Sequence, residues 1–212
     1  MTRVELTPEK LDALQELVNM GMGAAGAALA EALGVFVELA VPSVDFTDRR
    51  SVATLLDKGA WAKEEVEAIR QPFFGAFTGE SMMIFNEQVQ SELAELPGYA
   101  LATAGGKPTG AEQQEMLLDL ANVVIGACVN GIAEPFFQNV SFAAPSRLGT
   151  RDAIRAYLSH ETVAWHEGLI VNVDFKLEGR SLLSRVLVFL PEPSLQRIDE
   201  AVTRLLNDLA AS

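Results

Sequence analysis

The sequence predicts an α+β fold in which a helix, a strand and a hairpin occur twice. In each half of the 212-residue chain, a long helical pattern of apolar residues precedes segments with strand-like composition. A shift of 103 positions aligns four pairs of residues in the two halves: Glu16 with Asp119, Asn19 with Asn122, Gly23 with Gly126, and Pro42 with Pro145. The halves look like a duplication, so we expect one domain over 1–212, made of repeats of about 1–100 and 111–212.

The first helix has clear start and stop signals. Thr7 can cap it, and Pro8 suits its first position. Gly34 supplies the stop, so the helix is expected to end at about Leu33, and residues 35–41 then predict a strand. One apolar stripe at helical spacing is expected to face the core: Leu11, Leu14, Val18, Met22, Ala25, Leu29 and Leu33.

The rest of the first half is less regular. We expect short helices at about 62–70 and 87–96, with a hairpin at 73–85 between them. Residues 98–110 collect glycine and threonine around a Lys-Pro pair, which indicates a linker.

The second half repeats the order of the first. A helix is predicted at about 112–133, followed by an extended segment through Pro145 and a polar stretch. Strands at 168–177 and 182–190 are separated by a short turn segment, and a final helix is predicted at 194–209.

Composition indicates a cytoplasmic protein with a proper core. Hydrophobic residues make up 49% of the chain. No run approaches the ~20 apolar residues of a membrane-spanning helix, and the N-terminus lacks the apolar core of a signal peptide, so no membrane partner is expected. The single cysteine, Cys128, cannot form an internal disulfide and is expected to be a buried thiol.

The net charge of −13 excludes some partners. With 29 acidic and 16 basic residues, the chain repels polyanions and has no basic patch for DNA or RNA, so no nucleic acid partner is expected. A partner with a basic surface is favoured, although acidic residues also serve solubility.

Each long helix carries acidic and amide side chains on one face, roughly a quarter turn from the apolar stripe and directed to solvent. Two sets of residues have this spacing: Asp12, Glu16 and Asn19 in the first helix, and Glu115, Asp119 and Asn122 in the second. Solvated helix faces of this kind are common. Two copies at equal distance from a proline favour a functional site instead.

Three glycines in the first helix need an explanation. Gly21, Gly23 and Gly26 each cost ~1 kcal/mol of helix stability relative to alanine. They either admit a neighbouring element of the same molecule or allow the backbone of a folded partner to come close.

The two polar sets resemble the active-site signature of the CheC/CheX/FliY phosphatases of bacterial chemotaxis. The first copy is complete: Asp12-x3-Glu16-x2-Asn19-x22-Pro42. The second keeps asparagine and proline but has aspartate in place of glutamate: Glu115-x3-Asp119-x2-Asn122-x22-Pro145. Two copies in a chain of this length are more similar to CheC than to the shorter, single-site CheX.

This resemblance implies a pseudo-two-fold α+β domain with a largely antiparallel sheet and two long exposed active-site helices. It also implies a phosphatase that dephosphorylates a phospho-aspartyl, CheY-like response regulator. Asn19 would orient the attacking water and Glu16 would pair with a lysine of the regulator. The corresponding residues of the second copy are Asp119 and Asn122.

The same resemblance assigns the remaining positions and the cofactor. Residues one turn to either side of these pairs are expected to contact the substrate protein: Asp12, Gly23, Glu115 and Gly126. No cofactor of the protein's own is expected, because the Mg²⁺ belongs to the response regulator. Since aspartate is one methylene shorter than glutamate, we expect the second site to be the weaker one.

Two other functions stay open. Flagellar switch proteins share this fold and use it as a non-catalytic docking module, although the intact Glu16 and Asn19 argue against that role. Regulation of a CheD-like receptor deamidase by binding is compatible with the phosphatase function. Other hydrolase and nucleotide-binding motifs are absent from the sequence, and His160 and His166 are expected to be surface or structural residues.

Overall fold

The chain is described in a computed structural model over residues 7–40, 43–86, 88–93, 109–134, 139–160, 167–179 and 184–210. Most of the predicted linker at 98–110 lies outside these residues, as do Pro42 and His166.

The first helix, α1 (Pro8–Leu33), has the predicted ends. The side chain of Thr7 accepts a hydrogen bond from a backbone N–H of the first turn. Gly34 takes the left-handed conformation, with φ of 68°, and donates its N–H to the carbonyl oxygen of Ala30 at 3.0 Å. Three members of the predicted apolar stripe are fully buried: Leu14, Val18 and Met22.

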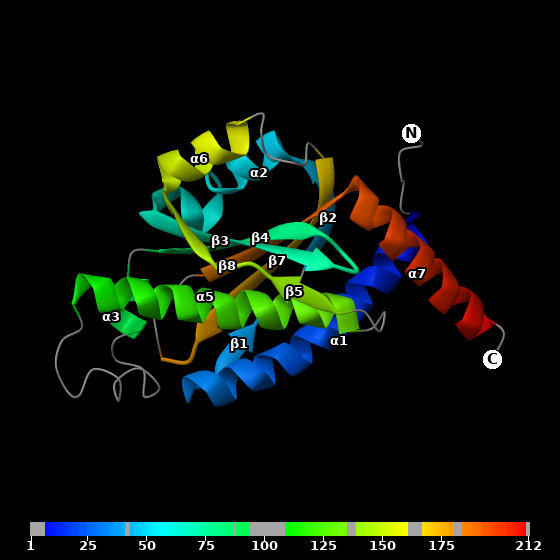
Figure 1. Ribbon diagram of the computed structural model, residues 1–212, viewed down its shortest axis with the longest axis horizontal. Coiled ribbons are helices and arrows are strands. Elements are labelled where there is room, and N and C mark those ends of the chain that lie inside the picture. Colours follow the sequence, from blue (N-terminus) through cyan, green and yellow to red (C-terminus); the bar gives the residue numbers. More distant parts are fainter. Residues whose placement is uncertain are drawn as a thin grey trace.

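The described strands form one eight-stranded sheet in which every described pairing is antiparallel (Figure 1). The strands are β1 (Val37–Leu39), β2 (Ser43–Asp48), β3 (Val66–Gly75), β4 (Gly79–Asn86), β5 (Val140–Phe142), β6 (Ser146–Thr150), β7 (Glu167–Leu177) and β8 (Ser184–Pro191). Their order is β1-β7-β8-β4-β3-β5, with β2 also paired to β7 and β6 to β3. The predicted α+β class and largely antiparallel sheet are confirmed.

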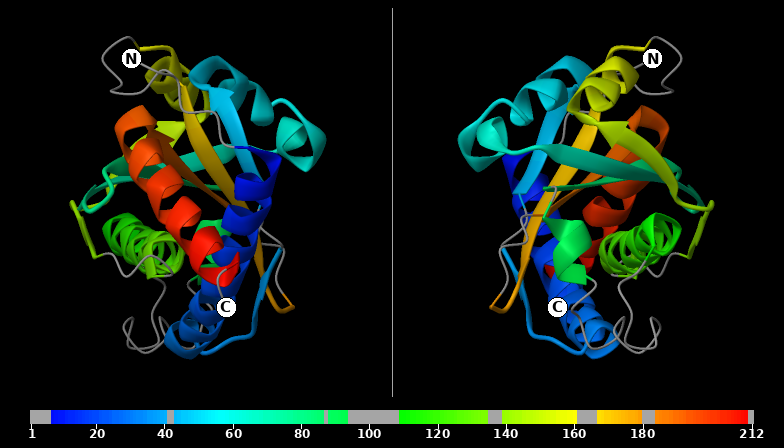
Figure 2. Two further views of the ribbon diagram at one scale, coloured as in Figure 1. Left: turned by 90° about the vertical axis from the view of Figure 1, so that its right-hand side faces the viewer. Right: turned by 90° about the vertical axis from the view of Figure 1, so that its left-hand side faces the viewer.

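Helices cover both faces of this sheet (Figure 2). On one face lie the long helices α1, α5 (Gly110–Ala133) and α7 (Glu192–Ala210), together with the short α3 (Val89–Leu93). The other face is covered by three shorter helical segments: α2 (Arg49–Leu55), the 3₁₀ helix η1 (Gly59–Lys63) and α6 (Arg151–Ser159). Each face has its own cluster of buried apolar residues, so the sheet separates two cores.

The halves of the chain exchange their edge strands. β1, which follows α1, pairs with β7 of the second half, with Val37 opposite Leu177. β5, which follows α5, pairs with β3 of the first half, with Phe142 opposite Phe73. The two hairpins, β3–β4 and β7–β8, meet at the β4–β8 pairing in the middle of the sheet. Neither half therefore contains all the partners of its own strands.

The structure corrects the sequence prediction for the less regular segments. The helix expected at 62–70 is wrong, because η1 ends at Lys63 and β3 begins at Val66. Val66 and Ala68 pack in the core under α6 while Ile69 packs in the core under α5, which is the two-residue alternation of a strand. The helix expected at 87–96 is described as the short α3 (Val89–Leu93). Two further helices were not predicted: α2 and α6.

α5 is a buried helix of the core, although its composition resembles that of a membrane-spanning helix. Among the described residues it is the one helix long and apolar enough to cross a membrane, but 61% of its most apolar window is buried inside the fold. Cys128 lies in this buried part, as predicted, and burial raises the pKa of its thiol to about 12. The thiol is therefore protonated and unreactive at neutral pH.

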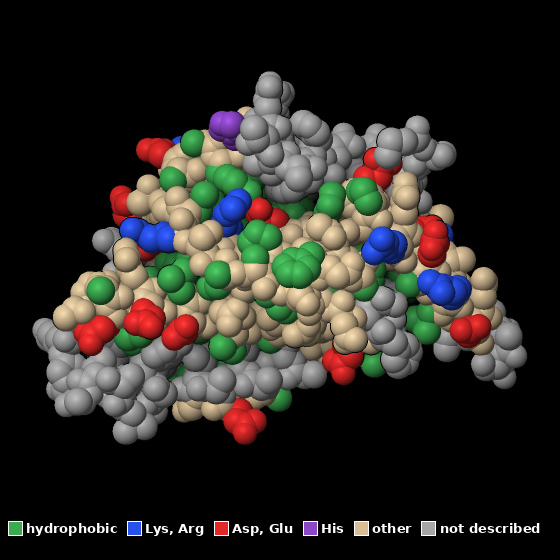
Figure 3. Space-filling model, viewed as in Figure 1, with side chains coloured by type: hydrophobic (Ala, Val, Ile, Leu, Met, Phe, Trp, Pro, Cys, Tyr) green, Lys and Arg blue, Asp and Glu red, His purple; other side chains and the backbone are tan. Residues whose placement is uncertain are grey.

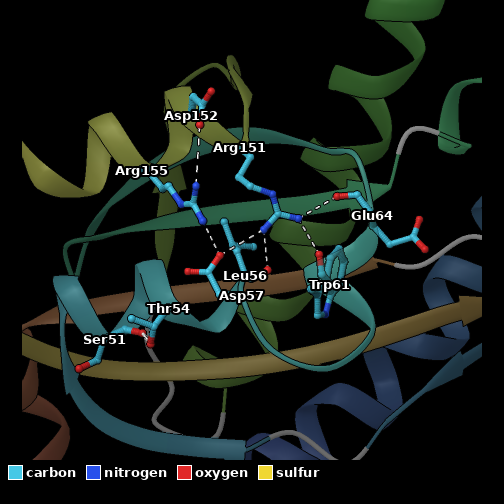
Figure 4. Close-up of polar contacts among 9 residues, drawn as sticks. All are labelled: Ser51, Thr54, Leu56, Asp57, Trp61, Glu64, Arg151, Asp152 and Arg155. Carbon is cyan, nitrogen blue, oxygen red and sulfur yellow. Dashed lines mark hydrogen bonds and ion pairs between the residues drawn. The ribbon is translucent and has the colours of Figure 1, made fainter.

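Arg151 joins α6 to the loop between α2 and η1 (Figure 4). Its guanidinium donates hydrogen bonds to the carbonyl oxygens of Leu56 at 2.5 Å, Trp61 at 2.6 Å and Glu64 at 2.7 Å. Arg151 also forms an ion pair with Asp57 at 3.6 Å, and the neighbouring Arg155 pairs with the same carboxylate. Arg151 thus ties α6 to three backbone oxygens, of which that of Trp61 also accepts from the N–H of Glu64 at the end of η1.

α1 and α5 run antiparallel and touch at two glycines (Figure 1). A Cβ atom built on Gly21 would lie 2.1 Å from the carbonyl oxygen of Gly131, and one on Gly131 would lie 2.9 Å from the carbonyl carbon of Gly21. Neither position can hold a larger residue without separating the helices. Gly21 is therefore required by packing within the molecule and not by the approach of a partner.

We predict that Gly21→Ala lowers the free energy of unfolding by ~1–3 kcal/mol or more, because the new methyl group overpacks this contact. Gly23→Ala is the matched control, since a Cβ atom there meets nothing within 4 Å and alanine favours the helix by ~1 kcal/mol. Urea unfolding measures both. Unchanged stability in Gly21→Ala would show that the two helices can move apart without cost.

Candidate functional site

The first ridge lies on the outer face of α1. Asp12, Glu16, Asn19 and Gly23 are all exposed. Their spacing places them along one side of the helix, while the opposite side packs on the sheet and α5. The predicted geometry of this ridge is therefore present.

The second ridge lies on α5 and has the same arrangement. Glu115, Asp119 and Asn122 are exposed, and Gly126 is half-buried. A Cβ atom on Gly126 would meet nothing within 4 Å, as at Gly23, so neither ridge glycine is required by internal packing. Figure 3 shows acidic side chains along the N-terminal part of this helix.

A capping box fixes the residue at which α5 begins, and so which side of the helix carries Glu115, Asp119 and Asn122. Glu112 accepts hydrogen bonds from the backbone N–H of Thr109 at 2.6 Å and from its hydroxyl at 2.8 Å. The backbone bond and then the hydroxyl bond lower the pKa of this carboxyl. The carboxylate is therefore held as an acceptor at the positive end of the helix dipole.

The two ridges form separate sites. Asn19 lies two residues before the glycine contact on α1, whereas Asn122 lies nine residues before it on α5. Because the helices are antiparallel, the two asparagines are roughly 16 Å apart along the helix pair, at 1.5 Å per residue. The structure brings together the members of each ridge but does not bring the ridges together.

Most ridge side chains have no partner within the described chain. No hydrogen bond or ion pair to a described residue is made by four carboxylates and one amide: Asp12, Glu16, Glu115, Asp119 and Asn19. Their polar groups are consequently available to another molecule.

Asn122 differs, because it is bonded to the sheet below. Gln71, a residue of β3 with no exposed surface, donates from Nε2 to Oδ1 of Asn122 at 2.7 Å. The same nitrogen donates to the carbonyl oxygen of Ala143 at 2.9 Å. The carbonyl oxygen of Ala143 can only accept, so the Gln71 amide must turn its Nε2 toward it. Because Nε2 donates, the atom of Asn122 that faces it must be the oxygen Oδ1. The NH₂ group of Asn122 is left pointing away from Gln71.

The first site lacks this support. In the second half, Ala143 donates its N–H to the carbonyl oxygen of Pro72. Ala40, which aligns with Ala143 in the first half, donates its N–H to the carbonyl oxygen of Asp174. The position that corresponds to Gln71 is therefore Val173, which has no side-chain donor. Sequence reasoning missed Gln71 because this residue falls between the helix expected at 62–70 and the hairpin expected at 73–85, whereas β3 overlaps both. A polar residue between Ile69 and Phe73 on the core-facing side of a strand would have been the signal.

A groove adjoins the first site. It has a volume of about 360 Å³ and lies between α1 and β1, where its lining includes Asn19, Gly23, Ala27 and Phe36. Phe36 is 63% exposed. Small residues on the C-terminal half of α1 thus make room beside Asn19 at a surface that is largely apolar.

The described residues of the two ridges include no cysteine, serine, threonine, lysine or histidine. Within the described ranges, no three histidine, cysteine or acidic side chains cluster in a way that could bind a metal. His160 is exposed at the end of α6, a helix that packs on the other face of the sheet from α1 and α5. Each ridge combines a carboxylate, which can accept hydrogen bonds from a cationic side chain, with an amide, which can both donate and accept hydrogen bonds.

This fold, with an acid and an amide on each long helix, resembles the CheC/CheX/FliY class of chemotaxis proteins. Residues 9–45, which contain all of α1 except Pro8 and include its ridge, match the family model CheC, the CheC-like family. No curated protein sequence matches the chain.

Solved structures are similar over most of the fold. FliY of Thermotoga maritima is similar with a TM-score of 0.68 and 16% identity, over 95% of this chain and 99% of that chain. A chain of the FliG–FliM complex of H. pylori gives 0.60 and 10%, over 92% and 100%. A chain of the CheX–CheY–BeF₃–Mg²⁺ complex of Borrelia burgdorferi gives 0.50 and 12%, over 82% and 97%. The resemblance to the CheC/CheX/FliY family, inferred from the sequence, is confirmed.

Proposed function

We propose that the protein is a phosphatase that removes the aspartyl phosphate from a CheY-like response regulator. One observation carries the proposal: Glu16 and Asn19 share an exposed helix face, one turn apart, and neither has a partner in the described chain. An unpaired carboxylate and amide on a rigid, open helix can enter the active site of another folded protein.

The chemistry needs no nucleophile from this chain. Water attacks phosphorus, its oxygen forms the new P–O bond, and the bond to the aspartyl oxygen of the regulator breaks to give a carboxylate and inorganic phosphate. The amide of Asn19 orients the water for in-line attack, which is an effect of position. Glu16 pairs with a lysine of the regulator and fixes the register of the two proteins. Asp119 and Asn122 repeat this pair on α5.

The nature of the partner is supported from two sides. A chain of a CheX–CheY–BeF₃–Mg²⁺ complex is similar to this fold. In addition, the net charge of −13 favours a partner with a basic surface and disfavours nucleic acid. We place the Mg²⁺ on the regulator, and we place the protein in the cytoplasm, where response regulators act. Binding of a CheD-like deamidase is compatible with this role.

A non-catalytic docking module is the second candidate. The FliG–FliM complex contains a chain with this fold, at a TM-score of 0.60, and the exposed groove beside Asn19 could serve a docked partner. A docking module would bind its partner without changing how fast the partner loses its phosphate.

We predict that the protein shortens the lifetime of a phosphorylated receiver domain and that Asn19→Ala/Asn122→Ala removes this effect. Loss of both amides leaves water unpositioned at both sites, so turnover should fall by about 10²-fold or more. Release of inorganic phosphate from the receiver domain measures it, and circular dichroism checks that the variant is folded. Unchanged turnover would exclude both asparagines from water positioning. No acceleration by the unmodified protein would favour the docking module.

A second prediction concerns the charge of Glu16. If its carboxylate pairs with a lysine of the partner, Glu16→Gln should weaken association and reduce its dependence on ionic strength. Binding is measured at about 50 and 300 mM salt by titration calorimetry. Glu9→Gln, a change of the same type on the first turn of α1, is the matched control and should leave the salt dependence nearly as it is. Identical salt dependence in Glu16→Gln and the unmodified protein would rule the contact out.

A third prediction is that the two sites are unequal. The Asp119 carboxylate reaches ~1.5 Å less far than a glutamate, and misplacement on the order of 1 Å can cost ~10²-fold in an orientation-dependent step. Asn19→Ala should therefore remove most of the turnover and Asn122→Ala little of it. Asp119→Glu should raise the activity of the second site. Equal losses from the two asparagine variants would mean that aspartate serves as well as glutamate there.

A further inference from the structure

We infer that Gln71 is a positioning residue of the second site: it fixes the amide of Asn122 so that the NH₂ group is presented outward. This inference rests on the proposed phosphatase function, and it concerns how that function is divided between the two helices.

The geometry allows Gln71 one orientation only. Both of its described contacts are made by Nε2, to the carbonyl oxygen of Ala143 at 2.9 Å and to Oδ1 of Asn122 at 2.7 Å. Rotating the Gln71 amide by half a turn would place an oxygen against two acceptors. The carbonyl oxygen of Ala143 thereby sets the orientation of Gln71, and Gln71 sets that of Asn122.

The arrangement is not needed for packing. Gln71 has no exposed surface, and its Oε1 atom has no hydrogen-bond partner among the described residues. A buried acceptor without a partner opposes folding, so the polar side chain is explained by what its Nε2 donates to. Ile69 and Phe73, its neighbours on the same side of β3, are apolar. Of the two donated bonds, the one to the carbonyl oxygen of Ala143 fixes the amide of Gln71, and the one to Asn122 reaches the ridge.

The effect on the reaction follows from what Asn122 has left to offer. One lone pair of Oδ1 is used by Gln71, so the free part of the amide is its two N–H donors and the second lone pair. A side chain held in this way loses no rotational freedom when a substrate arrives. At the first site Val173 occupies the corresponding strand position, so Asn19 must be ordered by the substrate itself.

The direct test is ¹⁵N relaxation of the side-chain amides in the full-length protein. The NH₂ group of Asn122 should approach the order parameter of a rigid backbone, about 0.85, and that of Asn19 should fall below about 0.6. In Gln71→Met, which keeps the length of the side chain but donates no hydrogen bond, Asn122 should become as mobile as Asn19. Gln71→Leu is a second variant should Gln71→Met fold poorly. Equal mobility of Asn19 and Asn122 in the unmodified protein would overturn the inference.

The kinetic test isolates the second site with Asn19→Ala. Adding Gln71→Met should lower kcat by about tenfold and change KM less than about twofold, because the docking surface is intact while the amide is no longer held. Adding Gln71→Met to Asn122→Ala should cause no loss beyond that of Asn122→Ala, since both act through one amide. Ser81→Ala is the matched control: Ser81 lies opposite Gln71 on β4, is equally buried and has no hydrogen-bond partner in the described part of the chain, so kcat should not change.

The outcomes separate this inference from the proposed function. An unchanged kcat in Asn19→Ala/Gln71→Met would overturn the positioning role of Gln71 while leaving the phosphatase function in place. The positioning role of Gln71 would also be overturned if the second site showed no turnover even after Asp119→Glu. A protein without any phosphatase activity but with a rigid Asn122 that loosens in Gln71→Met would refute the proposed function and still support Gln71 as the residue that orients the amide.

Discussion

The contact between Gly21 and Gly131 is the constraint on which the rest of the arrangement depends. Two helices whose backbones touch at one point have little freedom in rotation about their own axes, because turning either one would bring a side chain into the contact. This fixes the side of each helix that faces the sheet. It thereby fixes the opposite side as well, where the two ridges project. The glycines are inside the molecule, yet they determine which residues a partner meets.

The two sites have the same outline and a different internal support. The acidic residue is longer at the first site, where Glu16 stands in the place of Asp119, whereas the amide is held from below only at the second site, where Gln71 stands in the place of Val173. The first site thus has the longer acidic side chain, and the second has the more rigidly held amide. The first site can do without a held amide because the substrate can order Asn19 on binding, at a cost in conformational entropy.

Much of the fold could be predicted from the sequence because its longest elements carry strong signals. Thr7 and Gly34 mark the ends of α1, and the outward face of each long helix follows from its polar spacing. β3 could not be predicted at its start, because its charged residues imitate a helix and only the cores on both sides of the sheet reveal the alternation. Gln71 was missed for the same reason. The role of Gly21 depends on a contact with a residue 110 positions away, to which no local pattern points.

The exchange of edge strands has a consequence for how the chain reaches its native state. Val37 pairs with Leu177, so β1 has no partner until 140 further residues have been made. Contacts between residues so distant in sequence are slow to form. At a synthesis rate of ~5–20 residues per second, strands of the first half stay unpaired for several seconds before their partners are made. During this time α1 and the β3–β4 hairpin present apolar surface that the second half later covers. The newly made chain is consequently at its greatest risk of aggregation before α5 and β7 emerge, and its dependence on chaperones should be concentrated there.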